Sequence, residues 1–166
     1  MGNVELDEAR TAGGGAAVRF PVPPLLFAGP LAAGLVAHRL LPLPLPLGGH
    51  PATVAVGRAL VAGGAAFSFS GTVTAWRRHT TVVPHHAVSR LVTSGPFRIS
   101  RNPMYTGMVA ACVGAALWSG SSWPLLVLPL SVRTTVRWVV EPEEAYLQRR
   151  FGAEYDGYRF RVRRWL

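Results

Sequence analysis

Residues 52–76 read ATVAVGRALVAGGAAFSFSGTVTAW and contain a single charged side chain, Arg58. A helix needs about 20 mostly apolar residues to cross the ~30 Å hydrocarbon core of a bilayer. A core helix of a soluble protein needs one polar face, and this stretch has none. It therefore predicts a transmembrane helix. A ridge of small residues at four-residue spacing predicts the face that meets a neighbouring helix. The ridge comprises Ala62, Ala66, Ser70 and Thr74.

Acidic residues are missing from the middle of the chain, where none occurs between Ala9 and Val140. A soluble domain needs mixed charge on its surface, but a surface that faces lipid does not. All 17 basic residues are arginine, and they cluster between apolar runs. The net charge of +9 therefore fits membrane topology better than a nucleic-acid partner. The single cysteine, Cys112, excludes a disulfide framework or a cysteine-based metal site within one chain.

Three further apolar runs surround the first. Residues 20–41 are long enough to span, and residues 102–132 carry no charge but are interrupted by Ser-Gly-Ser-Ser at 119–122. The interruption predicts a hairpin of two helices, about 103–118 and 123–140. The fold class is therefore all-α, an integral membrane protein with about four transmembrane helices.

The topology follows from where the arginines lie. Arginine-rich loops stay in the cytoplasm, which places residues 77–102 and both termini on the cytoplasmic side. If the source is bacterial, the membrane is the cell membrane. The proline-rich connection at 42–49 and the Ser-Gly turn then face outward. Residues 1–19 are expected to be a flexible cytoplasmic tail. Residues 20–166 are expected to form one membrane-embedded domain, with its motifs in residues 80–166.

Three polar features carry the candidate chemistry, and each has a plainer reading. Asn102 and Pro103 predict a helix start, with Asn102 as cap, at the end of a loop that is otherwise a solvated connector. Arg133 and Arg137 lie four apart near membrane depth, where they either line a polar cavity or extend to the interface. The acidic run 141–144 either stabilises a helix start or binds a cation. The adjacent pair His85 and His86 is expected to be solvated, with no metal.

Two motifs resemble a known family. The segment 101–107, Arg-Asn-Pro-Met-Tyr-Thr-Gly, is preceded by Leu-Val-Thr-Ser-Gly-Pro-Phe at 91–97. Together they resemble the Arg-His-Pro-x-Tyr-x-Gly region of isoprenylcysteine carboxyl methyltransferases and phospholipid methyltransferases. Residues 143–165 then resemble that family's terminal Glu-Glu, Phe-Gly, Tyr and Arg pattern. The resemblance covers about residues 80–166 and does not include the N-terminal half beyond its apolar character.

The resemblance implies a cytoplasmic pocket for S-adenosylmethionine, formed with the C-terminal helix and open sideways to the bilayer. Arg137 matches a substrate-side arginine and is the expected catalytic-site residue. The residues implied to bind the cofactor lie in the loop, the helix start and the acidic run. They are Arg90, Leu91, Val92, Phe97, Arg101, Asn102, Pro103, Met104, Tyr105, Glu141 and Glu144.

Two departures from the family pattern bear on the acceptor. Asn102 replaces the usual histidine and Phe97 stands where tyrosine is common, so a role that needs a titrating imidazole is lost while hydrogen bonding is kept. Methyl transfer from a sulfonium needs alignment and exclusion of water rather than a catalytic triad. The acceptor, a lipophilic or small carboxylate, thiol or amine, stays open, as does the oligomeric state. A non-catalytic small multi-pass membrane subunit is the alternative; it explains the apolar runs but not the paired motifs.

Overall fold

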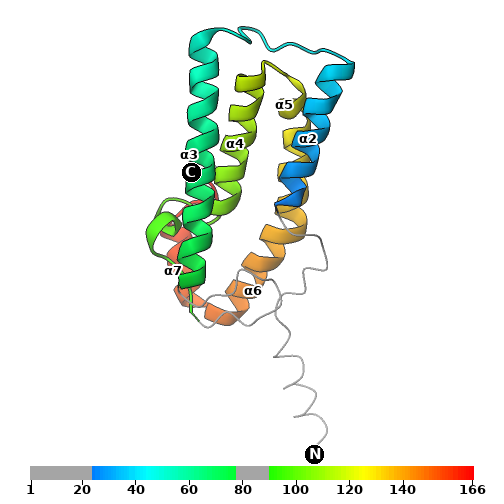
Figure 1. The fold of residues 1–166 in the computed structure, drawn as a ribbon. Coiled ribbons are helices and arrows are strands. Elements are labelled where there is room, and N and C mark those ends of the chain that lie inside the picture. The colour runs from blue at the N-terminus through cyan, green and yellow to red at the C-terminus, as the bar shows by residue number, and fades with distance from the viewer. Residues whose placement is uncertain (1–23, 78–89) are drawn as a thin grey trace, which may run out of the picture.

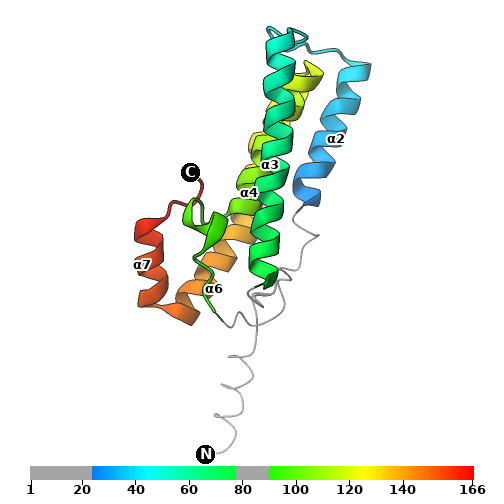
Figure 2. The ribbon, with the colours of Figure 1, turned by 60° about the vertical axis from the view of Figure 1, so that its left-hand side comes forward.

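The structure, a computed structural model, describes residues 24–77 and 90–166. The expected N-terminal tail and the His85–His86 pair lie outside these ranges. The described chain is helical and contains no strand, which confirms the all-α prediction for this part of the molecule. Its longer helices are α2 (Leu25–Leu40), α3 (Pro51–Arg77), α4 (Pro103–Ser119) and α5 (Trp123–Thr135), which run side by side (Figure 1). Beyond them lie α6 (Glu141–Phe151) and α7 (Ala153–Arg161) at one end of the bundle (Figure 2).

The predicted hairpin at 119–122 is confirmed. Helix α4 ends at Ser119, and Gly120 adopts a left-handed conformation with φ 66°, which glycine takes without a steric penalty. Helix α5 then begins at Trp123 with Pro124 in its first turn. The turn therefore reverses the chain and sets α5 beside α4.

The backbones of helices α3 and α4 lie so close together that the contact positions leave no room for a Cβ atom. Gly57, Gly64 and Gly71 are the buried glycines of α3, and they recur every seven residues. A Cβ on Gly64 would lie 2.5 Å from the Gly107 carbonyl oxygen, and one on Gly114 would lie 2.6 Å from the Gly57 carbonyl oxygen. The predicted ridge was wrong, since Ala62 and Ala66 are exposed. Every face of α3 is apolar, so small residues alone did not mark the contacting face.

One long helix bends without breaking. The backbone stays helical from Trp123 to Phe151, but the five residues Val136–Val140 form a π-turn, here called η2, between α5 and α6. Pro142 lies two residues beyond this turn. A proline has no N–H and clashes with the carbonyl four residues earlier, and a widened turn relieves that clash. The extra residue turns both Val139 and Val140 into the core. The predicted helix at 123–140 therefore continues into α6.

The bundle exposes much apolar surface. Exposed large side chains include Val36, Val56, Phe69, Leu126 and Leu130 on α2, α3 and α5. Of the helices in the described ranges, α3 is the one long and apolar enough to cross a membrane by itself, while α2 is apolar but shorter. An exposed apolar surface of this extent is typical of contact with lipid or a partner.

Candidate cofactor and acceptor site

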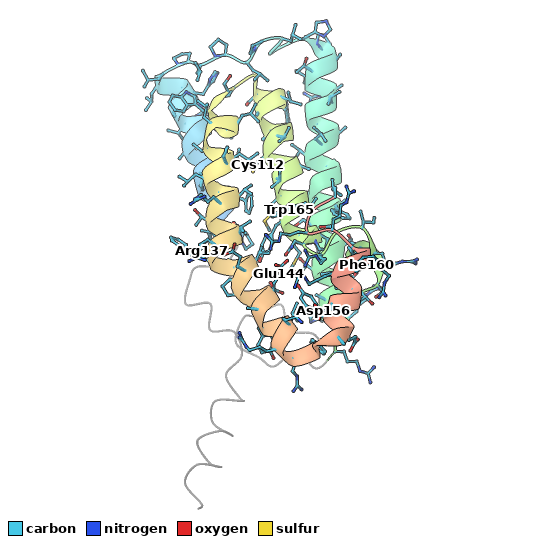
Figure 3. All side chains as sticks on the ribbon, turned by 180° about the vertical axis from the view of Figure 1, so that it is seen from behind. Cys112, Arg137, Glu144, Asp156, Phe160 and Trp165 are labelled. Atoms are coloured by element: carbon cyan, nitrogen blue, oxygen red, sulfur yellow. The ribbon has the colours of Figure 1, made fainter. Side chains whose placement is uncertain are left out.

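A buried ion-pair network lies where α4 begins. Glu144 of α6 is 3.0 Å from Nη1 of Arg101, and it accepts two hydrogen bonds from Arg164, at 2.6 Å from Nη2 and 3.1 Å from Nε. The side chains of Arg101 and Glu144 are 11% and 14% exposed. The two-pronged pairing fixes the geometry as well as the charge. Figure 3 shows Glu144 at this end of the bundle, with Trp165 beside it.

The C-terminal segment is bonded to the start of α4 through its backbone. The Arg101 N–H donates to the Arg163 carbonyl oxygen at 2.9 Å. The Ser100 hydroxyl and the Asn102 side-chain amide donate to the Arg164 carbonyl oxygen, at 3.2 and 3.1 Å. Asn102 occupies the predicted cap position, but its side chain makes no cap hydrogen bond, and its NH2 group donates to the C-terminal segment. That part of the prediction was wrong.

A tyrosine pair holds the preceding loop against α7. Tyr155 and Tyr158 are buried and pack with Leu91 and Leu147. The Tyr158 hydroxyl donates to the Phe97 carbonyl oxygen at 2.8 Å, and Arg101 Nη1 donates to the Tyr155 hydroxyl at 3.3 Å. Burial raises the pKa of both tyrosines, so both stay protonated at neutral pH. The loop, α4 and α7 thus form one connected wall.

Not every implied cofactor residue faces this wall. The side chains of Pro103 and Met104 lie against Gly71 of α3. Tyr105 belongs to the core formed with Val139 and Val140. The structure brings together Leu91, Phe97, Arg101, Asn102 and Glu144, whereas Arg90 is exposed at the beginning of the described segment.

Two polar groups at this end have no partner among the described residues. Arg101 Nε is buried without a hydrogen bond. Glu143 is accessible to solvent, and neither an ion pair nor a hydrogen bond engages it within residues 24–77 and 90–166. The surrounding protein and the nearby charge of Glu144 raise the pKa of the Glu143 carboxyl above its usual range. Glu143 was not among the residues that the family resemblance implied for the cofactor, although it lies next to Glu144, which was.

A separate groove runs along α5 and η2. Its volume is about 930 Å³, and it is apolar along α5 and charged at the η2 end. The lining residues are Leu125, Leu128, Pro129, Val132, Arg133, Val136, Arg137 and Glu141. Arg137 and Glu141 form an ion pair at 3.1 Å, as the one-turn spacing predicts. The Arg137 side chain is 77% exposed and is therefore not buried in the groove. Arg133 has no ion-pair or hydrogen-bond partner in the described part of the chain.

The comparison with known families matches this architecture. The model of the phospholipid methyltransferase family matches residues 52–154, from the beginning of α3 into α7. The chain belongs to the phospholipid methyltransferase family. It is therefore a methyltransferase of a membrane-associated family. The matched range holds both arginines of the groove and the Arg101–Glu144 pair, so this methyltransferase carries its candidate site within the family region.

The known relatives add little on the substrate. An uncharacterised protein of Haemophilus influenzae is 33% identical to this methyltransferase over 63 residues, which are 38% of this chain and 100% of that protein. No solved structure matches the chain.

Proposed function

We propose that the protein transfers a methyl group from S-adenosylmethionine to a lipophilic or small acceptor held in the α5 groove, in the manner of isoprenylcysteine carboxyl methyltransferases. The observation that carries the proposal is the groove itself, which is apolar along its length and ends at Arg133, Arg137 and Glu141. Of these charges, Glu141 lies three residues, about one helical turn, before Glu144 on α6. A cofactor site and an acceptor site are thereby joined by a single helix.

The residues at the start of α4 fit the cofactor chemically. The orphaned Arg101 Nε is a donor for its carboxylate, and the free carboxylate of Glu143, with that of Glu141, suits its ammonium group. Glu144 already accepts from two arginines, so its role is to position Arg101. Met104 contributes through its backbone, because its side chain packs on α3. The cofactor, when bound, supplies an activated methyl group, and the chain aligns the acceptor and excludes water.

We further propose four membrane spans, with the Arg101–Glu144 end and both termini in the cytoplasm. Exposed apolar side chains on α2, α3 and α5 support this placement. The protein is expected to sediment with membranes and to remain there after carbonate and high-salt washes, because apolar burial in lipid does not respond to salt. Fractionation followed by immunoblotting measures this. Release by salt alone would mean that the helices pack as a soluble core.

The cofactor role of Glu141 is tested by Glu141→Ala. The change is expected to weaken S-adenosylmethionine binding by about 1.5–3 kcal/mol, the range for a hydrogen bond to a charged group. Calorimetry on the purified protein in detergent measures it. Glu154→Ala on the exposed surface of α7 removes the same charge elsewhere and serves as control. Equal affinities for both variants would leave Glu141 with only its ion pair to Arg137.

The acceptor role of Arg137 is tested by Arg137→Lys. Lysine keeps the charge but loses the planar two-pronged geometry, so kcat/KM for the acceptor is expected to fall by at least about tenfold, or 1.4 kcal/mol. Cofactor affinity is expected to stay within about twofold, because lysine keeps the positive charge beside Glu141. Acceptor kinetics at saturating cofactor are compared with cofactor titrations. A collapse of cofactor affinity with normal acceptor kinetics would move Arg137 to the cofactor site.

The function as a whole is tested by an acceptor screen with a labelled methyl donor on purified protein. Carboxylate and thiolate acceptors need no general base, while an amine must first be neutral. Methyl incorporation into a lipophilic acceptor with an acidic group is the expected result. A folded protein that binds no S-adenosylmethionine would instead be a non-catalytic membrane subunit.

A further inference from the structure

The connection between α2 and α3, residues 41–50, crosses the end of the bundle remote from α6 (Figure 1). Leucine alternates with proline at 41–47, and no Arg, Lys, Asp or Glu occurs between Arg39 and Arg58. The side chains of Leu41, Leu43 and Leu47 are 67%, 40% and 78% exposed. A loop in water rarely presents so continuous an apolar surface.

The amide groups of residues 41–46 are satisfied inside the protein. Proline has no N–H, which removes three donors between residues 41 and 47. The N–H groups of Leu41, Leu43 and Leu45 donate to the Ala37 carbonyl oxygen, to His38 Nδ1 and to the Gly120 carbonyl oxygen, at 2.7, 3.3 and 2.7 Å. From Leu41 to Pro46 every backbone donor is therefore either absent or bonded.

The carbonyl groups are nearly as well satisfied. The Leu41 oxygen accepts from the Trp123 indole at 2.9 Å, and the Leu43 oxygen accepts from the Ser122 N–H at 2.9 Å. The oxygens of Pro44 and Leu45 accept from the Ser122 hydroxyl and the Gly48 N–H, at 3.2 and 2.8 Å. An aqueous loop has no need of such pairing, whereas backbone next to hydrocarbon must be paired internally.

One leucine is kept at an unfavourable backbone conformation. Leu47 has φ 64°, a region that glycine adopts easily and leucine does not, and two glycines follow it at once. A strained and exposed leucine indicates that the side chain itself is needed there.

Two helices of the bundle are short relative to the thickness of a bilayer. Helices α2 and α4 have 16 and 17 residues, so each is only about 24–26 Å long at 1.5 Å per residue. That is a few ångströms less than a ~30 Å hydrocarbon core. Trp118 and Trp123 lie at the same end of the bundle as the loop, and tryptophan is enriched at the interface between lipid and water.

We propose that residues 41–47 are a membrane-embedded loop, with the exposed leucines among the lipid acyl chains of the outer leaflet. Its partner is lipid, and the loop completes the hydrophobic height that the short helices lack. The inference rests on the proposed membrane topology but is independent of methyl transfer.

The test uses nitroxide labels at Leu43→Cys and Leu47→Cys, in a Cys112→Ala background, with the full chain in phosphatidylglycerol/phosphatidylethanolamine nanodiscs. Collisions with oxygen report lipid, and collisions with a nickel chelate report water. Leu130→Cys, on the exposed apolar surface of α5, is the lipid control, and Arg161→Cys is the aqueous control. Both loop labels are expected to give oxygen-to-nickel ratios close to that of Leu130→Cys.

The controls separate the possible failures. Aqueous ratios at both loop labels, with a lipid ratio at Leu130→Cys, would overturn the embedded loop while leaving the topology intact. An aqueous ratio at Leu130→Cys as well would overturn the membrane topology on which the inference rests. A third result is a label that oxygen and nickel both reach in nanodiscs but that neither reaches in native membranes. That result would show that another protein covers the loop, and it would also overturn the proposal.

Discussion

Replacing Gly64 with alanine is expected to push α3 away from α4 and to lower the free energy of unfolding by about 3 kcal/mol, the upper end for an overpacked core. The added methyl group would lie 2.5 Å from the Gly107 carbonyl oxygen and 2.8 Å from the Ala111 nitrogen. Both are backbone atoms, so no rotamer change relieves the contact. The helices must separate, and their packing is lost along the whole crossing.

The adjacent glycine supplies a matched control. A Cβ on Gly63 would meet nothing within 4 Å, so Gly63→Ala adds the same methyl group to the same helix without a clash. Alanine is favoured over glycine in a helix by about 1 kcal/mol, so this variant is expected to be neutral or more stable. Thermal unfolding in detergent, followed by tryptophan fluorescence, compares the two. Equal shifts in Tm would show that the close approach of α3 and α4 contributes little.

Replacing Glu144 with alanine is expected to cost about 3–5 kcal/mol of stability, the range for removing one partner of a buried ion pair. The loss leaves the guanidinium of Arg101 without its carboxylate, in a side chain that is 11% exposed. It also releases Arg164, and with it the C-terminal segment that closes this end of the bundle. Unfolding is followed by the same tryptophan fluorescence.

The control for Glu144 is Glu141→Ala, whose partner Arg137 is 77% exposed. An exposed pair one turn apart contributes up to about 1 kcal/mol, so this variant is expected to unfold close to the unchanged protein. A double-mutant cycle of Glu144→Ala with Arg164→Ala is expected to be non-additive, because the two residues share two hydrogen bonds. Additive effects, or a loss no larger than that of Glu141→Ala, would contradict the network.

The sequence predicted where helices and turns lie, but it did not predict which side of a helix contacts its neighbour. The charge-free run at 102–132 and its Ser-Gly interruption predicted α4, the turn and α5, because glycine and serine have a specific effect on the backbone. The predicted ridge on α3 was wrong because the helix has no polar side that would mark which side faces outward. The contact also depends on glycines of α4 at matching spacing. The number of spans stays a prediction, since α2 and α4 are short.

Part of the candidate site was likewise predicted from the sequence, and part was not. Motif residues Arg101 and Glu144 were predicted to share a site, and they form an ion pair. Their union with Arg164 was not predicted, because the segment is held through the carbonyl oxygens of Arg163 and Arg164, and a backbone carbonyl leaves no mark in a sequence. The use of Asn102 on that carbonyl was missed for the same reason.

The π-turn at Val136–Val140 changes the direction in which side chains point before and after it along the long helix. Side chains advance by about 100° per residue around a helix, so one extra residue rotates everything beyond it by that angle. Before the π-turn, Leu125 and Leu128 line the groove. After the π-turn, Glu144 points toward Arg101. A regular α-helix of the same sequence would aim only one of these sets correctly. A single inserted residue therefore sets the angular offset between the α5 groove and the Arg101–Glu144 ion pair.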